Sequence, residues 1–232
     1  MADHLSEEEQ IEALKRWWNE NWVSIVLPII LVLVGYFGWN FWNNQQLAEA
    51  QSASDQFQAL TEQAEVAPGM DMSAEQKVGI SQSAEALVAE HEGTLYADMA
   101  SLMLARLHVE DNQLEAAAAR LQSVVDGGSN ESISLLATAR LARVLAAKGE
   151  PEQALQFVAQ TSSEAYTALF AEIRGDIYQS QGKYQEAHTA YGVALETLPP
   201  TEYNRSSLIQ LKRDAAALPE SEPEVVDAEG DA

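Results

Sequence analysis

The chain has 232 residues, no cysteine, and a formal net charge of −23 that comes from 36 Asp and Glu against 13 Lys and Arg. This charge excludes nucleic acid as a partner, because phosphate backbones are bound by clustered Lys and Arg. The lack of cysteine excludes disulfides, thiol nucleophiles and thiolate metal sites.

Residues 1–21 form an N-terminal segment with the pattern of a short helix. Ser6 is followed three residues later by Glu9, as in a capping box. Ile11, Leu14 and Trp18 then fall on one face of a helix. The segment is either a solvated leader or a small docking element, and the sequence leaves both open.

Residues 22–42 are predicted to form a transmembrane helix. No charged residue occurs from Asn21 to Ala48, and the apolar run from Trp22 to Trp39 covers about 27 Å as a helix, close to the ~30 Å hydrocarbon core of a bilayer. All five tryptophans lie in or beside this stretch, as is typical of the membrane boundary. The alternative is a cleaved signal peptide, whose apolar part is usually shorter.

The basic residues around this helix predict its orientation. Lys15 and Arg16 precede it, and the next basic residue is Lys77. Because Lys and Arg close to a span favour the cytoplasmic side, we expect a cytoplasmic N-terminus and a C-terminal part on the other side of the membrane.

Residues 43–72 are predicted to be a stalk helix and a linker. Residues 47–66 are rich in Ala, Gln and Glu, which favour helix. The sequence Ala67-Pro68-Gly69 ends this helix, and Ser73 is the expected cap of the next one.

Residues 73–218 are predicted to form an all-α domain of helical hairpins, because Ala- and Leu-rich runs at helical spacing alternate with short turns. Three related copies recur at offsets of 37 and 33 residues, close to the roughly 34 of tetratricopeptide repeats. Each copy has a small residue (Ala105, Ala142, Gly175), a turn residue (Asn112, Gly149, Gly182), an Ala (Ala117, Ala154, Ala187) and a larger apolar residue (Leu121, Val158, Tyr191).

The two ends of this domain differ in pattern. The helix predicted from Tyr203 to Leu218 covers the open end of the stack, as a terminal repeat must. Residues 219–232 are acidic, contain proline and have few apolar side chains. They are therefore predicted to be a disordered tail.

No pattern typical of an enzyme occurs, and no catalytic residue, metal site or cofactor is expected. The four histidines are scattered at positions 4, 91, 108 and 188, without the spacing of a metal site. His108 occupies the place of Leu145 and Tyr178 in the repeats, so we expect it to be a half-buried packing residue.

Binding is the better-supported activity. In a stack of helical hairpins the first helix of each pair lines the concave side, where apolar patches and Arg side chains suit an extended peptide or a helix. The alternative is that the apolar members are simply core. The candidate partner-binding residues are Met99, Leu102, Arg106, Leu136, Arg143, Glu172, Asp176 and Gln179.

Several motifs resemble the YfgM family, and the resemblance runs from about residue 7 to 215. They are Glu12-Ala13-Leu14-Lys15-Arg16-Trp17-Trp18-Asn19-Glu20-Asn21, Gly38-Trp39-Asn40-Phe41-Trp42-Asn43, Tyr96-Ala97-Asp98-Met99-Ala100-Ser101-Leu102, Ala139-Arg140-Leu141-Ala142-Arg143-Val144 and Arg174-Gly175-Asp176.

The resemblance implies an ancillary subunit of the SecYEG translocon: a single-span inner-membrane protein with a periplasmic tetratricopeptide-like domain. The implied partners are the membrane-anchored chaperone PpiD and secreted polypeptides that leave the channel. The implied alternative role is to restrain a stress-response regulator through the cytoplasmic segment. The family offers no catalytic residues to carry over.

Overall fold

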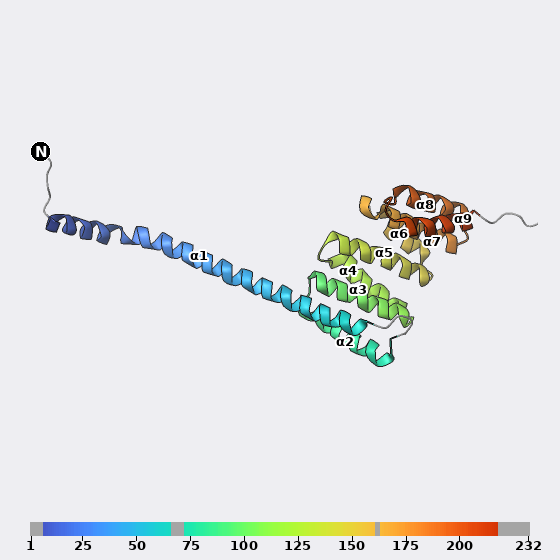
Figure 1. Cartoon of the computed structure of the whole chain (residues 1–232), viewed down its shortest axis with the longest axis horizontal. Helices are drawn as coiled ribbons and strands as arrows, with labels where there is room; N and C mark the ends of the chain where they lie inside the picture. Colours follow the sequence, from blue (N-terminus) through green and yellow to red (C-terminus); the bar gives the residue numbers. More distant parts are fainter. Residues whose placement is uncertain (1–6, 66–71, 161–162, 218–232) are drawn as a thin grey trace, which may run out of the picture. The chain divides into compact units, whose positions relative to one another are not determined.

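The computed structural model describes residues 7–65, 72–160 and 163–217 (Figure 1). The expected cap at Ser6, most of the linker before Ser73 and the acidic tail lie outside the described residues. Within these ranges the chain is helical and has no strand, which confirms the all-α class. The helices are α1 (Glu7–Ala64), α2 (Ala74–Glu90), α3 (Leu95–Glu110), α4 (Leu114–Gly127), α5 (Glu131–Ala147), α6 (Pro151–Gln160), α7 (Thr167–Ser180), α8 (Tyr184–Thr197) and α9 (Tyr203–Ala216), with a 3-10 turn at Glu164–Tyr166 before α7.

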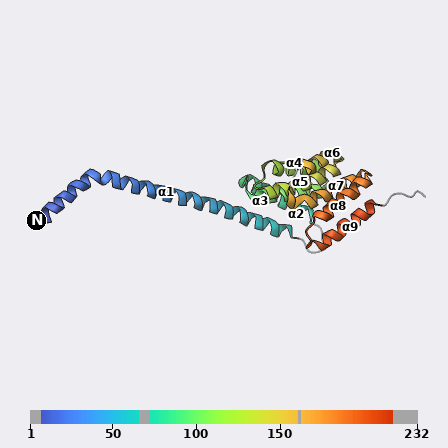
Figure 2. The same cartoon turned by 90° about the horizontal axis from the view of Figure 1, so that it is seen from above.

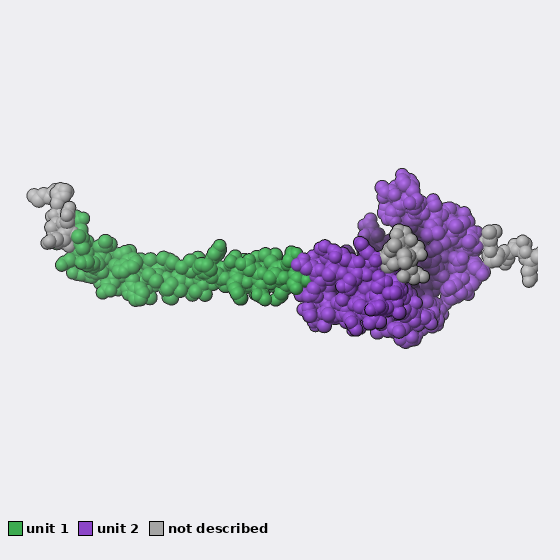
Figure 3. All heavy atoms as spheres, turned by 60° about the horizontal axis from the view of Figure 1, so that its bottom comes forward, with its two compact units in different colours: residues 1–52 green, residues 53–232 purple. Residues whose placement is uncertain are grey.

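The chain divides into two compact units, residues 1–52 and 53–232, which Figure 3 colours separately. In the described part of the first unit, α1 exposes apolar side chains on all sides, among them Leu31, Val34 and Trp39. A helix that is apolar all round requires an apolar surrounding. It is the only helix among the described residues that is long and apolar enough to cross a membrane.

Pro28 lies inside α1 without ending it. Proline has no N–H, so the carbonyl group of Ser24 loses its helical partner, and the ring crowds the preceding turn. Figure 2 shows α1 bent in its N-terminal part.

The last turns of α1 belong to the second unit. Ala53, Phe57, Leu60 and Ala64 form a stripe at helical spacing, in which Ala53 and Leu60 are fully buried. Leu60 shares a core cluster with Ile80 and other apolar residues of α2 and α3. The helical domain therefore includes residues from position 53, whereas the sequence pattern placed a stalk and linker over residues 43–72.

Side-chain caps fix where several helices begin. Ser73 and Gln76 form a reciprocal capping box at the start of α2, as the sequence predicted for Ser73. Thr94 caps α3 and Asn130 caps α5 by accepting a hydrogen bond from a backbone N–H. Each cap satisfies a backbone donor that the helix itself leaves unpaired.

The hairpins α3–α4, α5–α6 and α7–α8 share one turn geometry. The predicted turn residues Asn112, Gly149 and Gly182 all have positive φ, at 57°, 86° and 72°. In each turn the next N–H bonds to a carbonyl five residues back, as Lys183 does with Tyr178 at 2.9 Å. This is the Schellman arrangement, which favours Gly or Asn at the left-handed position.

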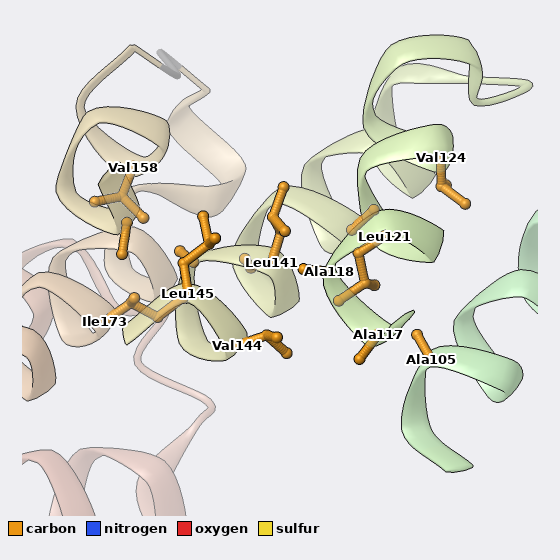
Figure 4. Packing of buried hydrophobic residues seen from close by; sticks show 14 of the residues in the cluster. Ala105, Ala117, Ala118, Leu121, Val124, Leu141, Val144, Leu145, Val158 and Ile173 are labelled. Carbon is orange, nitrogen blue, oxygen red and sulfur yellow. The ribbon is translucent and has the colours of Figure 1, made fainter. Parts of the chain in front are cut away.

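Small and large residues alternate between the two helices of each hairpin. Ala117, Ala154 and Ala187 are fully buried, and Figure 4 shows the central cluster of the second unit around Ala117, Leu121 and Val158. In the third copy a Cβ on Gly175 would lie 2.4 Å from a ring carbon of Tyr191. Glycine is therefore required opposite tyrosine, whereas Ala105 and Ala142 stand at this place in the other copies.

The first helices of successive hairpins form one layer, because α3 contacts α5 and α5 contacts α7. Helix α9 follows α8 at the place where the first helix of a further hairpin would begin. It contacts α8 and bonds to α7 through charged side chains. We call the exposed side of this layer, which carries Arg106 and Arg143, its outward face. The candidate site lies there.

Candidate functional site

Three arginines lie on the outward face of α3 and α5. Arg106 of α3 and Arg143 of α5 occupy equivalent repeat positions and are exposed. Arg140 lies one turn before Arg143, so both project from the same side of α5. We call Arg106, Arg140 and Arg143 the arginine face.

Arg140 is influenced by the charges of the other two arginines. Burial lowers the pKa of Arg140, and the positive charges of Arg106 and Arg143 lower it further. Arg106 and Arg143 therefore both lie near Arg140, because solvent screens distant charges. The arginine face is therefore a concentrated positive patch on a strongly acidic chain.

The arginine face has few internal partners. Arg106 Nε donates a hydrogen bond to Glu110 Oε1 at 2.8 Å. In residues 7–65, 72–160 and 163–217, no ion pair joins Arg140 or Arg143 to an acidic side chain. By contrast, Lys148 and Lys212 each pair with two carboxylates. Arg140 and Arg143 are thus available to an external anionic group.

The three apolar candidates differ in burial. Met99 and Leu136 are half-buried and pack with their inner sides against the central cluster. Leu102 is 5% exposed and belongs to the cluster itself. A ligand on the arginine face would therefore touch Met99 and Leu136, while Leu102 supports them from below.

The three candidates on α7 are held by internal bonds. Glu172 is 5% exposed and accepts hydrogen bonds from Arg205 Nη2 at 3.0 Å and Lys212 Nζ at 2.8 Å, both on α9. Asp176 accepts from Lys212 Nζ at 2.8 Å and from the Tyr191 hydroxyl at 2.9 Å. The Tyr191 hydroxyl also donates to Gln179 at 2.7 Å. We call Glu172, Asp176, Tyr191, Arg205 and Lys212 the α7–α9 ion cluster.

The α7–α9 ion cluster shifts the pKa values of its members. Burial acts to raise the pKa of Glu172, but the hydrogen bonds and charges of Lys212 and Arg205 outweigh it and lower the pKa. Burial acts to lower the pKa of Lys212, and its bonds to Asp176 and Glu172 raise it instead. Both groups are thus held in their charged forms, and α9 closes this end of the layer.

The repeat alignment did not identify two residues that matter for the structure, Arg140 and Asp98. Arg140 aligns with Met103 and Ile173, which are apolar, so the alignment gave no sign of a charge at this position. Its spacing of three residues from Arg143 was the signal that both arginines share one face of the helix. Asp98 is 8% exposed and accepts a hydrogen bond from the Ser129 backbone N–H at 2.7 Å. It fixes α3 to the turn between α4 and α5.

The histidines have structural surroundings. His108 is half-buried, as predicted, and its Nδ1 lies 2.9 Å from Gln113 Oε1. His91 Nε2 lies 3.2 Å from Gln56 Nε2 of α1. Across the described ranges, no group of three or more His, Cys, Asp and Glu side chains is arranged to hold a metal ion.

Comparison with known proteins identifies the relatives of this chain. A family model described as "Tetratricopeptide repeat-like domain" matches residues 15–218. An Escherichia coli protein named "Ancillary SecYEG translocon subunit" is 33% identical over 215 residues, which cover 91% of this chain and 97% of the relative. A protein with the same name from Haemophilus influenzae is 29% identical, over 85% of this chain and 92% of its own length. A third, from Neisseria gonorrhoeae, is 28% identical, over 93% of this chain and 99% of its own length.

These matches include the apolar part of α1 as well as the hairpins, since the family model begins at residue 15 and extends to residue 218. The fold and the length thus agree with the motifs that carried the resemblance. The chain belongs to the family of ancillary SecYEG translocon subunits with a tetratricopeptide repeat-like domain.

Proposed function

We propose that the chain is a non-enzymatic scaffold anchored in the inner membrane beside the Sec translocon. The relatives are named for this assembly, and α1 is long and apolar enough to anchor the chain. Lys15 and Arg16 before the span favour a cytoplasmic N-terminus. The helical domain is then periplasmic, where secreted polypeptides emerge.

The orientation has a direct test. Alkaline phosphatase fused after Ala232 folds only in the periplasm, so the fusion is expected to be active in intact cells. A matched fusion at the N-terminus is expected to be inactive. An inactive C-terminal fusion of normal abundance would overturn the periplasmic placement.

The helical domain holds its partner on the outward face of α3 and α5. The partner is a periplasmic chaperone of the PpiD type or a secreted polypeptide that leaves the channel. The observation that carries this proposal is that the arginine face is open and flanked by half-buried Met99 and Leu136. Guanidinium groups beside apolar side chains suit a polypeptide, which offers carbonyl and carboxylate acceptors next to apolar groups.

Affinity purification from solubilised membranes tests this face. We expect Arg106→Glu/Arg143→Glu to lose the chaperone or the polypeptide while the protein keeps its abundance. The control variant is Arg120→Glu/Lys183→Glu, which changes the charge equally at positions on α4 and at the start of α8. Unchanged co-purification by Arg106→Glu/Arg143→Glu would contradict this binding face.

A second candidate function uses the N-terminal segment. Ile11 and Leu14 are exposed by more than half, and a hollow lined by Leu14, Lys15, Trp18 and Asn19 lies on the same part of α1. These side chains suit a cytoplasmic partner, such as a stress-response regulator that the segment restrains. Ile11→Ser/Leu14→Ser is expected to release such a regulator and to leave periplasmic partners bound; an unchanged stress response would contradict this role.

A further inference from the structure

The arginine face has an excess of positive charge that the described residues do not balance. Three of the 11 Lys and Arg that follow residue 42 gather there, and Glu110 is the one carboxylate that the described residues bond to it. Elsewhere in the second unit Lys77, Lys148, Arg205 and Lys212 each have carboxylate partners. An acidic occupant is the chemical complement of such a patch.

The chain itself contains a segment of matching charge. Residues 218–232 include no Lys or Arg and six acidic residues, which are Glu220, Glu222, Glu224, Asp227, Glu229 and Asp231. These six carboxylates lie within 15 residues, with no cation among them. Its charge is opposite to that of the arginine face.

The origin of this segment places it within reach. It follows Ala217 directly after α9, and α9 is bonded to α7, which contacts α5. Packed helices lie roughly 8–10 Å apart, so α5 is about 20 Å from α9 across the layer. Fifteen residues span up to about 50 Å when extended, which is enough for the acidic residues to reach α5 and α3.

We propose that residues 218–232 dock in cis on the arginine face of α3 and α5. Six carboxylates in a short segment can pair with Arg140 and Arg143, which no described carboxylate neutralises, and with Arg106. Tethering makes this docking effective, because a short connection gives an effective concentration in the millimolar range.

The docked segment would regulate access to the face. If the proposed function is correct, the segment competes with the partner for the same arginines, and its removal raises partner capture. The docking itself does not depend on the proposed function. It is therefore tested by a physical measurement in which no partner is present.

The absence of native cysteine allows a spin-label experiment on the full chain in lipid nanodiscs. One label is attached at Ala147→Cys, an exposed position one turn after Arg143, and the other at Ala228→Cys. Electron–electron double resonance is expected to show a short-distance population in low salt. Raising NaCl from about 0.05 M to about 0.5 M is expected to remove this population, since salt screens exposed charges.

Charge variants assign the population to the arginine face. Arg140→Gln/Arg143→Gln is expected to lose the short distance, while the matched control Arg120→Gln/Lys183→Gln keeps it. Circular dichroism confirms that both variants remain helical. Persistence of the short distance in Arg140→Gln/Arg143→Gln, or its absence from the parent protein, would overturn the proposal.

Two further arms distinguish other occupants. Dilution of labelled protein with unlabelled protein leaves a cis contact unchanged, so a loss of the short distance would mean docking on a second copy and would overturn docking in cis. A chain that ends at Ala217 is also titrated with a synthetic peptide of residues 218–232. Binding to this chain that Arg140→Gln/Arg143→Gln abolishes supports the proposal, and equal binding to both chains contradicts it.

Discussion

One repeat position lies on the outward face of α3 and α5 and on the equivalent face of α7. Its side chain is exposed in the first two copies and bonded to the next helix in the third. Arg106 and Arg143 occupy this position in the first two copies and are exposed. Asp176 occupies it in the third copy and is bonded to Lys212 of α9 at 2.8 Å. The comparison shows that a repeat position sets where a side chain points, while the next helix decides whether it stays available.

The difference follows from what lies beside each helix. Glu172 stands at the place of Leu102 and Ala139, which are both buried in the central cluster. On α7, which faces α9, the Glu172 carboxylate is 5% exposed and is paired with Arg205 and Lys212. The end of the layer is therefore closed by polar bonds, whereas Arg140 and Arg143 in its middle have no ion-pair partner among the residues that the structure describes.

A methyl group at Gly175 is expected to destabilise the α7–α8 hairpin more than any other single change. In Gly175→Ala the new methyl group overlaps the ring of Tyr191, so we expect the free energy of unfolding to fall by about 1–3 kcal/mol. Urea unfolding of the full chain in detergent measures it. In the control Gly192→Ala, where nothing lies within 4 Å, stability rises by about 0.5–1 kcal/mol.

The same site offers a rescue. Gly175→Ala/Tyr191→Leu copies the pair Ala105 and Leu121 from the first hairpin. We expect it to be more stable than Gly175→Ala alone, because the smaller side chain leaves room for the methyl group. A double variant that is less stable than either single variant would contradict the small–large pairing.

The next effect opens the α7–α9 ion cluster. Glu172→Gln removes the buried charge that Arg205 and Lys212 share, and we expect a loss of about 1–3 kcal/mol. Hydrogen exchange should rise in α9 and remain unchanged in α3 and α5. Equal exchange in α9 of parent and variant would show that the ion cluster does not hold this helix.

The ion cluster also predicts how stability depends on pH. Glu172 has a folded-state pKa below its ordinary value of 4.5. Its contribution is therefore complete above about pH 4.5 and is lost as the pH falls through the lower folded value. Lys212 has a folded-state pKa above 10.5, so its contribution is present below pH 10.5 and is lost as the pH rises through the folded value.

Unfolding curves across pH measure this dependence. Glu172→Gln is expected to have a shallower loss of stability on the acid side, because the titrating carboxyl is gone. Lys212→Met is expected to have a shallower loss on the alkaline side. Identical acid-side slopes for Glu172→Gln and the parent would contradict the lowered pKa of Glu172.

A smaller effect concerns the shared turns. Gly182→Ala places a side chain at φ 72° and is expected to cost about 1 kcal/mol. Asn112→Gly relieves the same restriction in the first hairpin and is expected to be neutral or slightly stabilising. A gain in stability for Gly182→Ala in urea unfolding would contradict the left-handed turn.

The smallest effect concerns the open face. Arg140→Gln removes a charge that Arg106 and Arg143 repel, so we expect the free energy of unfolding to change by less than about 0.5 kcal/mol. Partner capture should nevertheless fall. A variant that loses stability to the same extent as Glu172→Gln would show that Arg140 has an internal partner.

The sequence predicted the elements whose causes are local. The apolar run between Asn21 and Ala48 identified the membrane helix by composition, and Asn112, Gly149 and Gly182 identified the turns because few other residues adopt positive φ. The pair Gly175 and Tyr191 was also predictable, since small and large residues alternate at fixed spacing.

The sequence did not predict what depends on contacts between distant residues. Glu172 resembles any exposed carboxylate until Arg205 and Lys212 are placed beside it by the fold. Arg140 was hidden by the apolar residues at its equivalent positions. The second unit begins at Ala53, where α1 continues without a break. Phe57, Leu60 and Ala64 pack with α2 and α3, and a continuous helix gives no local sign of such a boundary.

Site-specific photocrosslinking can locate the partner-binding face in intact cells. A photoreactive amino acid is placed at Ala147, which is exposed one turn beyond Arg143, or at Ala119, which is exposed on α4 in the other layer. In cells that are exporting protein, the probe at position 147 is expected to capture a translocon-associated chaperone or a nascent secreted polypeptide, and the probe at position 119 is not. Equal capture at both positions, or capture at 119 alone, would contradict the assignment of the binding face to α3 and α5.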